Sequence, residues 1–184
     1  MAYYATIVTT LGTLALLAVA LAVGLGAALA SAGGRERLRA ALQGQERHPI
    51  GWAWGVALIA MSGSLYLSEI AHLLPCSLCW YQRIAMYPLV LVLGVGLLRA
   101  EPTVWRYAIP LPVVGLAIAA YHVVIQWMPN LDVGACTTGA PCTGRYVAVF
   151  GFVSIPTMAG AAFLLIIPLL LLVRMLEGAD EQEA

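Results

Sequence analysis

The sequence predicts an all-α integral membrane protein, on three observations. Hydrophobic residues make up 62% of the chain and charged residues only 10%. The mean hydropathy of +0.91 lies far above that of a soluble domain with a polar surface. The charges are also segregated, since none occurs between Met1 and Gly34 or between Tyr146 and Val173. Uncharged stretches of this length can cross a bilayer core, which needs about 20 apolar residues.

Five apolar stretches are long enough to span a membrane, and the short connections between them predict one compact bundle. In chain order they lie at Ala5–Leu29, Ile50–Leu74, Trp80–Leu98, Tyr107–Met128 and Val147–Val173. The chain then divides into an extra N-terminal helix in residues 1–34, an arginine-rich connection in 35–49, a four-helix membrane domain in 50–173 and an acidic tail in 174–184. We expect the tail to be disordered from Glu177 onwards.

The arginines predict the orientation, because short connections rich in Lys and Arg stay on the cytoplasmic side. Seven of them fall at one end of the predicted bundle: Arg35, Arg37, Arg39, Arg47, Arg99, Arg106 and Arg174. We therefore expect the C-terminus in the cytoplasm and the N-terminus outside. Both cysteine-bearing connections, Pro75–Cys79 and Pro129–Arg145, then face out of the cytoplasm, where disulfides persist.

A cleaved signal peptide is the alternative interpretation of the first span. Ala28-Leu29-Ala30 resembles a small-residue cleavage site. However, no Lys or Arg precedes Leu11, and cleavage would place the arginine-rich connection outside.

The first cysteine pair, Cys76 and Cys79, forms a CxxC motif at the start of the third span. We expect Cys79 near the helix N-terminus, whose partial positive charge lowers the pKa of a thiol and favours the reactive thiolate. Arg83 follows one helical turn later on the same face. An unpaired arginine in a bilayer is costly, so Arg83 should face the bundle interior, where it can stabilise a thiolate or bind a polar ligand head. Snorkelling to lipid headgroups is the alternative.

The second pair, Cys136 and Cys142, lies in a connection that also contains Gly134, Pro141 and Gly144. Such a connection is suited to attack by another protein's thiolate and to movement toward the first pair. The alternative is a fixed structural disulfide. A Cys₄ zinc site is a further alternative, but the second pair lacks CxxC spacing, and we expect no metal. The sequence also contains no nucleotide or flavin motif, and we expect no nucleic-acid partner.

Two polar pairs lie within the predicted spans. His122 and Gln126 share one face of the fourth span at about the depth of Arg83, so the three could line a polar niche that faces the CxxC. A histidine hydrogen-bonded in the core is the alternative for His122. Glu69 and His72 lie three residues apart at the end of the second span, and we interpret them as interfacial.

Three stretches of sequence resemble the DsbB family of disulfide-bond formation proteins, and more closely its BdbC-like branch. They are Cys76-Ser77-Leu78-Cys79-Trp80-Tyr81-Gln82-Arg83-Ile84, then Tyr121-His122-Val123-Val124-Ile125-Gln126 with the later Pro141-Cys142, and Gly151-Phe152-Val153-Ser154-Ile155-Pro156-Thr157. The resemblance covers residues 50–173. It implies a DsbB-like four-helix bundle in a bacterial plasma membrane, to which the first helix is extra.

The resemblance also implies a function and roles for the residues that match. The enzyme would reoxidise a thioredoxin-like partner such as DsbA or BdbD and pass the electrons to a membrane quinone, either ubiquinone or menaquinone. Cys136 would be attacked by the partner, Cys142 would exchange with Cys76, and Cys79 would face the quinone. The head group of the quinone would then be bound by the three polar residues Arg83, His122 and Gln126.

Two other functions fit part of the pattern. The vitamin K epoxide reductase family also consists of bundles with a quinone-type cofactor and two cysteine pairs, but there the loop pair precedes the CxxC, whereas here the CxxC comes first. A non-catalytic membrane scaffold with two structural disulfides is the second alternative. Resistance of both disulfides to a reduced thioredoxin-like protein would favour that scaffold.

Overall fold

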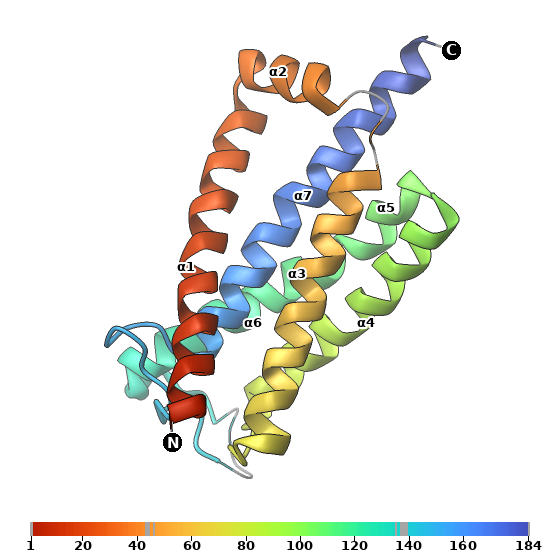
Figure 1. Cartoon of the computed structure of the whole chain (residues 1–184). Helices are drawn as coiled ribbons and strands as arrows, with labels where there is room; N and C mark the ends of the chain where they lie inside the picture. The colour runs from red at the N-terminus through yellow and green to blue at the C-terminus, as the bar shows by residue number, and fades with distance from the viewer. Residues whose placement is uncertain (1, 43–44, 46, 135, 137–139, 184) are drawn as a thin grey trace.

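Figure 1 shows the computed structural model of the chain, which describes residues 2–42, 45, 47–134, 136 and 140–183. Five helical segments are long and apolar enough to cross a membrane: Tyr3–Ala30, Arg47–Ile70, Ser77–Arg99, Pro102–Trp127 and Ile155–Gly178. The β pairing within the described residues is a single isolated bridge. The all-α membrane fold predicted from the sequence is therefore confirmed.

The last helix, α7 (Ile155–Glu183), is the centre of the bundle (Figure 1). It packs against α1 (Ala2–Ala30), α3 (Arg47–Leu65) and α6 (Pro110–Trp127). The remaining long helix, α4 (Ser77–Arg99), packs against both α3 and α6. In the most apolar part of each helix, 67% of α7 is buried but only 11% of α1. Helix α1 is thus an outer helix placed against a four-helix core.

The core of the bundle is made by apolar side chains from facing helices. Leu89 and Leu93 of α4 and Phe163 and Leu170 of α7 are completely buried in one cluster. Gly115 of α6 allows the close approach of α7, because a Cβ at this position would overlap the Phe163 ring. Small residues have this role in membrane bundles, where helices associate through close packing.

The second membrane span ends earlier than predicted. Helix α3 is followed by a π-helical turn, η1 (Tyr66–Ile70), and the chain is not helical after it. His72 adopts a φ of 53°, which a right-handed helix cannot continue. The predicted end at Leu74 was therefore wrong. The irregular segment between η1 and Ser77 sets Cys76 at the start of α4.

The fifth span begins later than predicted, at Ile155 and not at Val147. The intervening residues form a turn with a bridge between Val149 and Val153. These valines are buried in a cluster that includes Val8 of α1. The valines of this apolar run are therefore buried against α1, which hydropathy cannot distinguish from burial in lipid.

The remaining segments also differ from the prediction. The arginine-rich connection contains a helix, α2 (Ala32–Leu42), which crosses one end of the bundle (Figure 1). The fourth span starts before the predicted Tyr107, with a 3₁₀ turn, η2 (Pro102–Val104), and a short helix, α5 (Trp105–Ala108). Helix α7 continues to Glu183, so the expectation of a disordered tail was wrong.

The two ends of the bundle differ in character. The N-terminus and both cysteine-bearing connections lie at one end, and α2 and the C-terminus lie at the other (Figure 1). At this second end Arg106 and Arg174 both lie over the Trp105 ring, and Arg106 pairs with Glu177 at 3.7 Å. The cysteines and most of the arginines are therefore separated by the length of the bundle.

Candidate active site

The CxxC motif begins α4. Cys76 is the N-cap residue, with an extended backbone, and its Sγ accepts a hydrogen bond from the Cys79 backbone N–H at 3.4 Å. A sulfur in this position lies in the partial positive charge of the helix N-terminus. The pair is a dithiol, and its two Sγ atoms are 2.9 Å apart. Cys79 lies in the first turn of α4, as predicted, and Cys76 is the residue that caps the helix.

The surroundings of Cys76 favour its thiolate. The hydrogen bond from the Cys79 thiol is the largest cause that holds the pKa of Cys76 well below its ordinary value. Burial acts in the opposite direction, and hydrogen bonds from His122 and from the Cys79 backbone N–H add to the lowering. A closely coupled pair such as this titrates as a unit. In this arrangement the surroundings favour the thiolate of Cys76, whereas the sequence led us to expect the thiolate at Cys79.

Cys136 and Cys142 form a disulfide in the connection between α6 and α7, with their Cα atoms 5.9 Å apart. Cys142 is buried and Cys136 is half-buried. A disulfide sulfur is not a thiolate ligand, so this pair does not complete a Cys₄ zinc site.

The structure brings the two pairs together. Cys76 and Cys142 are 4% and 1% exposed and share one buried cluster. Cys79 and Cys136 pack against the same cluster. Thiol–disulfide exchange requires a thiolate to reach a disulfide sulfur directly. Membership in one cluster provides the proximity for exchange between the pairs.

His122 of α6 bridges the two pairs. Its Nε2 lies 3.1 Å from the backbone carbonyl of Cys142 and 3.7 Å from Sγ of Cys76, and its Nδ1 lies 3.3 Å from Nε2 of Gln82. A carbonyl oxygen only accepts and an amide NH₂ only donates. His122 therefore carries its proton on Nε2, which points at Cys76 and Cys142. The side chain is 2% exposed, so this network is sealed from solvent.

Arg83 lies on the cavity side of α4 and is anchored on α3. Its Nε donates to Oγ of Ser64 at 3.0 Å, and its Nη2 donates to the Ser64 backbone carbonyl at 3.1 Å. The guanidinium also lies over the Trp80 ring, 5.1 Å from its centroid. A guanidinium has five N–H donors, and Nη1 has no hydrogen bond to the described residues. Donors therefore remain for a ligand.

Sequence reasoning missed Ser64 and Gln82. A small polar residue in an apolar span is a weak signal, although polar side chains in membrane helices usually face the interior. Gln82 is 5% exposed and directs its amide to His122. Gln82 directly precedes Arg83 in the sequence, and this neighbouring position could have identified it as a site residue.

Gln126 has both ends of its amide engaged by the chain. Its Nε2 donates to the Gly144 carbonyl at 3.3 Å, and its Oε1 accepts from Oγ of Ser154 at 2.7 Å. These contacts tie α6 to the disulfide connection and to the residue before α7. Gln126 also lines the cavity described next.

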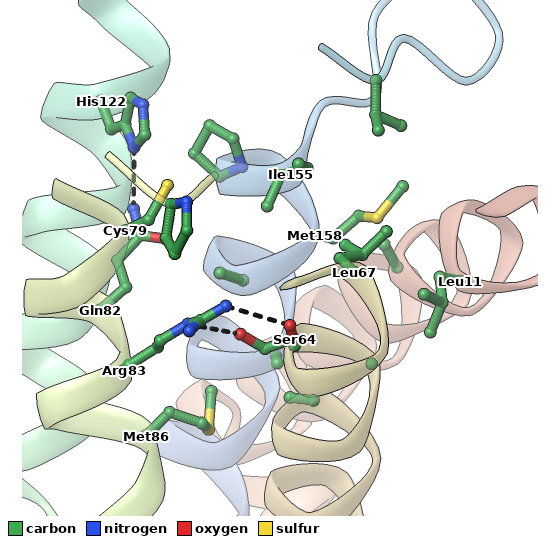
Figure 2. Close-up of a pocket in the computed structure, with 18 of the residues that line it drawn as sticks. Leu11, Ser64, Leu67, Cys79, Gln82, Arg83, Met86, His122, Ile155 and Met158 are labelled. Atoms are coloured by element: carbon green, nitrogen blue, oxygen red, sulfur yellow. Dashed lines mark hydrogen bonds between the residues drawn. The ribbon is translucent and has the colours of Figure 1, made fainter. Parts of the chain in front are cut away.

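A cavity of about 360 Å³ begins at the CxxC and extends between the helices. Figure 2 shows Cys79, Gln82, Arg83 and Met86 one after another along its α4 side, with His122 above them. The opposite side carries apolar residues such as Leu11. A cavity with a few polar groups at one end and apolar walls is typical of a site for an amphipathic small molecule.

Glu69 and His72 do not line this cavity, and both are exposed. Glu69 accepts a hydrogen bond from Oγ of Ser68 at 2.9 Å. Their exposure at the end of the bundle agrees with an interfacial position.

Three residues at the site could ligate a soft metal ion. The side-chain ligand atoms of Cys76, Cys79 and His122 lie within 4.8 Å of one another. Two sulfurs and an imidazole nitrogen suit Zn²⁺. This set of ligands was not predicted from the sequence, from which only a zinc site of four cysteines was considered.

The family described as disulfide bond formation protein DsbB matches residues 46–173. The chain belongs to the DsbB family. It is therefore a multi-pass membrane protein that takes part in disulfide-bond formation. The reaction class is that of a thiol oxidoreductase. The match begins just before α3, so α1 and α2 lie outside the part of the chain that matches the DsbB family.

Curated relatives support the same assignment. Disulfide bond formation protein C of Bacillus subtilis is 48% identical over 116 residues, which are 62% of this chain and 84% of that protein. Probable disulfide formation protein C 2 of Bacillus cereus is 46% identical over 124 residues, 67% of this chain and 89% of that protein. Probable disulfide formation protein C of Halalkalibacterium halodurans is 49% identical over 115 residues, 62% of this chain and 84% of that protein. No solved structure matches the chain.

Proposed function

We propose that this DsbB-family protein oxidises a thioredoxin-like dithiol protein of the DsbA or BdbD type and delivers the two electrons to a membrane quinone. The observation that carries the proposal is the shared cluster of the two cysteine pairs, one of which also lines the amphipathic cavity. A disulfide, a dithiol and a cavity in that order form a continuous route for electrons.

The proposed relay consists of two exchanges, each through a mixed disulfide. A partner thiolate attacks Cys136, which breaks the Cys136–Cys142 bond, and the second partner thiol releases the oxidised partner. Cys142 then attacks Cys76, which breaks a Cys76–Cys79 bond, and Cys136 attacks Cys142 to restore the loop disulfide. The partner has lost two electrons and two protons, and the CxxC has gained them.

The cavity residues fit a quinone. When bound, a quinone supplies the final acceptor, since it takes up two electrons and two protons to become the hydroquinone. The remaining donors of Arg83 can bind a ring oxygen, and its positive charge favours the reduced ring. His122 holds a proton on Nε2 beside Cys76 and keeps Cys142 within reach of the CxxC. Gln126 positions the disulfide connection at the same cavity.

We also propose an orientation in a bacterial plasma membrane. The arginine-rich end of the bundle, with the C-terminus, faces the cytoplasm, and both cysteine connections face the extracytoplasmic side, where disulfides persist. A membrane-impermeant thiol reagent, applied to intact cells after mild reduction, should then label Cys136, which is only half-buried. Labelling only after lysis would reverse the orientation and remove access to an extracytoplasmic partner.

The decisive experiment is a reconstituted assay in detergent or nanodiscs. The purified protein should contain or bind a quinone and should reduce it with electrons from a reduced thioredoxin-like protein. Parallel assays with ubiquinone and menaquinone identify the preferred ring. A Cys79→Ser variant is the negative control. If the wild-type protein oxidises the dithiol donor but reduces neither quinone, the proposed acceptor is wrong.

A further inference from the structure

One wall of the cavity is built by α1, which precedes the segment that matches the DsbB family. The α1 residues that line it are Leu11, Leu14, Ala15, Leu17, Ala18 and Leu21. Their spacing places them along one face of the helix. The remaining walls come from the four-helix core, so α1 adds a wall that residues 46–173 alone do not supply.

The cavity is a slot between α1 and α3, and α7 forms its base. Both α1 and α3 pack against α7 (Figure 1). Met158, Ala162 and Leu165 of α7 line the slot. From Leu11 to Leu21 the α1 wall extends about 15 Å along the helix axis, at 1.5 Å per residue, which is roughly half of the hydrocarbon core.

At the end of the slot near the cysteines, α1 makes close contacts with its neighbours. A Cβ added to Gly63 of α3 would lie 3.1 Å from Cδ2 of Leu11. Gly12 has a similar close contact with Val149, with 2.8 Å between an added Cβ and Cγ1. Gly63 directly precedes Ser64, which anchors Arg83, so the contact with Leu11 lies beside the polar end of the slot.

The slot is open further along α1. Its lining residues Leu17 and Leu21 are 61% and 62% exposed, and Ile59 on the α3 side is 53% exposed. In a membrane this opening faces lipid. A molecule with a polar head and a long apolar chain could therefore keep its head at Arg83 while its chain leaves toward the bilayer.

We propose that α1 forms the tail subsite of the quinone site, in which the isoprenoid chain lies in the slot between α1 and α3. This inference rests on the proposed function, since it requires a quinone ring at Cys79 and Arg83. Lipid is as apolar as leucine, so transfer of the chain from lipid into the slot contributes little by hydrophobicity alone. The slot contributes by shape, because it orients the chain and thereby the ring.

The test compares two adjacent leucines of α1. Leu17 lines the slot, whereas Leu16, which is 40% exposed, does not. Leu17→Trp should fill the slot and raise KM for a long-chain menaquinone by about tenfold, in line with the cost of overpacking. KM for menadione, which has the same ring without the chain, should stay unchanged. Leu16→Trp should alter neither KM value. If the wild type prefers ubiquinone, a long-chain ubiquinone and its tail-free analogue replace menaquinone and menadione in this test.

The outcomes separate the two proposals. A wild-type protein that reduces neither long-chain nor tail-free quinones removes the proposed function itself. A wild type that reduces both, with Leu17→Trp indistinguishable from Leu16→Trp, overturns the tail subsite alone. Equal loss for the long-chain and the tail-free quinone in Leu17→Trp also overturns it, because a tail contact cannot affect menadione.

A second measurement does not depend on a variant that folds. A quinone with a photoreactive group in its isoprenoid chain is bound to the wild-type protein and irradiated, and the labelled peptides are identified. Label on α1 between Leu14 and Leu21 supports the subsite. Label confined to α4 and α6, with none on α1, overturns it.

Discussion

The two cysteine pairs are held in contrasting ways. Cys76 and Cys79 lie at the N-terminus of a long helix, where the backbone itself donates a hydrogen bond to sulfur. Cys136 and Cys142 lie in the connection between α6 and α7, and neither residue is part of a helix or strand. The largest favourable contribution to the Cys76 thiolate therefore comes from within the motif, from Cys79, and His122 of α6 adds to it.

The second pair is positioned by side chains from elsewhere. His122 binds the Cys142 carbonyl, and Gln126 binds the Gly144 carbonyl. Arg145 donates to the Gly151 carbonyl at 2.7 Å and lies 4.3 Å from the Trp127 ring centroid. The difference teaches that changes in α4 should alter the chemistry of the CxxC and that changes in α6 should alter the exchange between the pairs, except at His122, which contacts both pairs and should affect both.

The largest expected effects come from the cysteines. Cys79→Ser should abolish quinone reduction with every thiol donor, since no CxxC disulfide can form. The double variant Cys136→Ser/Cys142→Ser should abolish oxidation of the protein partner, yet dithiothreitol should still drive quinone reduction through the CxxC. Quinone absorbance and partner thiol titration measure the two activities. Full partner oxidation without the loop pair would reject the two-step relay.

His122→Ala removes a side chain that contacts both pairs. A buried hydrogen bond lost with its acceptor left in place costs about 1–3 kcal/mol, or roughly 5- to 150-fold, and we expect a fall of that order in partner-driven turnover. The pKa of Cys76 should rise, because its thiolate loses a donor. Thiolate absorbance of the reduced protein should therefore disappear at a higher pH than in the wild type.

His122→Gln is the matched control, because its amide NH₂ can still donate. It should recover part of both the turnover and the low pKa of Cys76. An identical thiolate titration in wild type and His122→Ala would show that the histidine does not act on Cys76.

Arg83→Ala should raise KM for quinone by about tenfold, the effect of losing a hydrogen bond from a charged donor. Arg83→Lys keeps the charge without the planar fork and should recover only part of the affinity. Ser64→Ala should have a smaller effect, since Arg83 keeps its bond to the Ser64 carbonyl. A fall in thermal stability with unchanged KM in folded Arg83→Ala would assign Arg83 a purely structural role.

The smallest effect should follow from Gln126→Leu. This change removes hydrogen bonds to Gly144 and Ser154 and should lower stability by about 1–2 kcal/mol, with slower exchange between the pairs and an unchanged dithiothreitol-driven rate. Thermal unfolding and rapid-quench thiol trapping measure these quantities. The exposed neighbour Val124, changed to Leu, is the control. Equal loss of the dithiothreitol-driven rate in Gln126→Leu would contradict the division between α4 and α6.

Much of the fold could be predicted because the bilayer imposes it. A span needs about 20 apolar residues, and its backbone N–H and C=O groups must be hydrogen-bonded within the helix. Five apolar stretches were therefore enough to find the five membrane-spanning helices. The boundaries were less accurate. Residues 147–153 are as apolar as a span, and only the tertiary structure shows that they form a turn whose three valines pack in a cluster with Val8 of α1.

The sequence by itself determined the fold class, the segregation of arginines from cysteines, and the CxxC motif before Arg83, because composition and short spacings are local properties. The tertiary structure alone decided which sulfur caps α4, that His122 joins Cys76 to Cys142, and that Ser64 anchors Arg83. It also decided that α1 lines the cavity. These contacts join residues far apart in the chain, and their formation depends on how the helices pack, which no local pattern specifies.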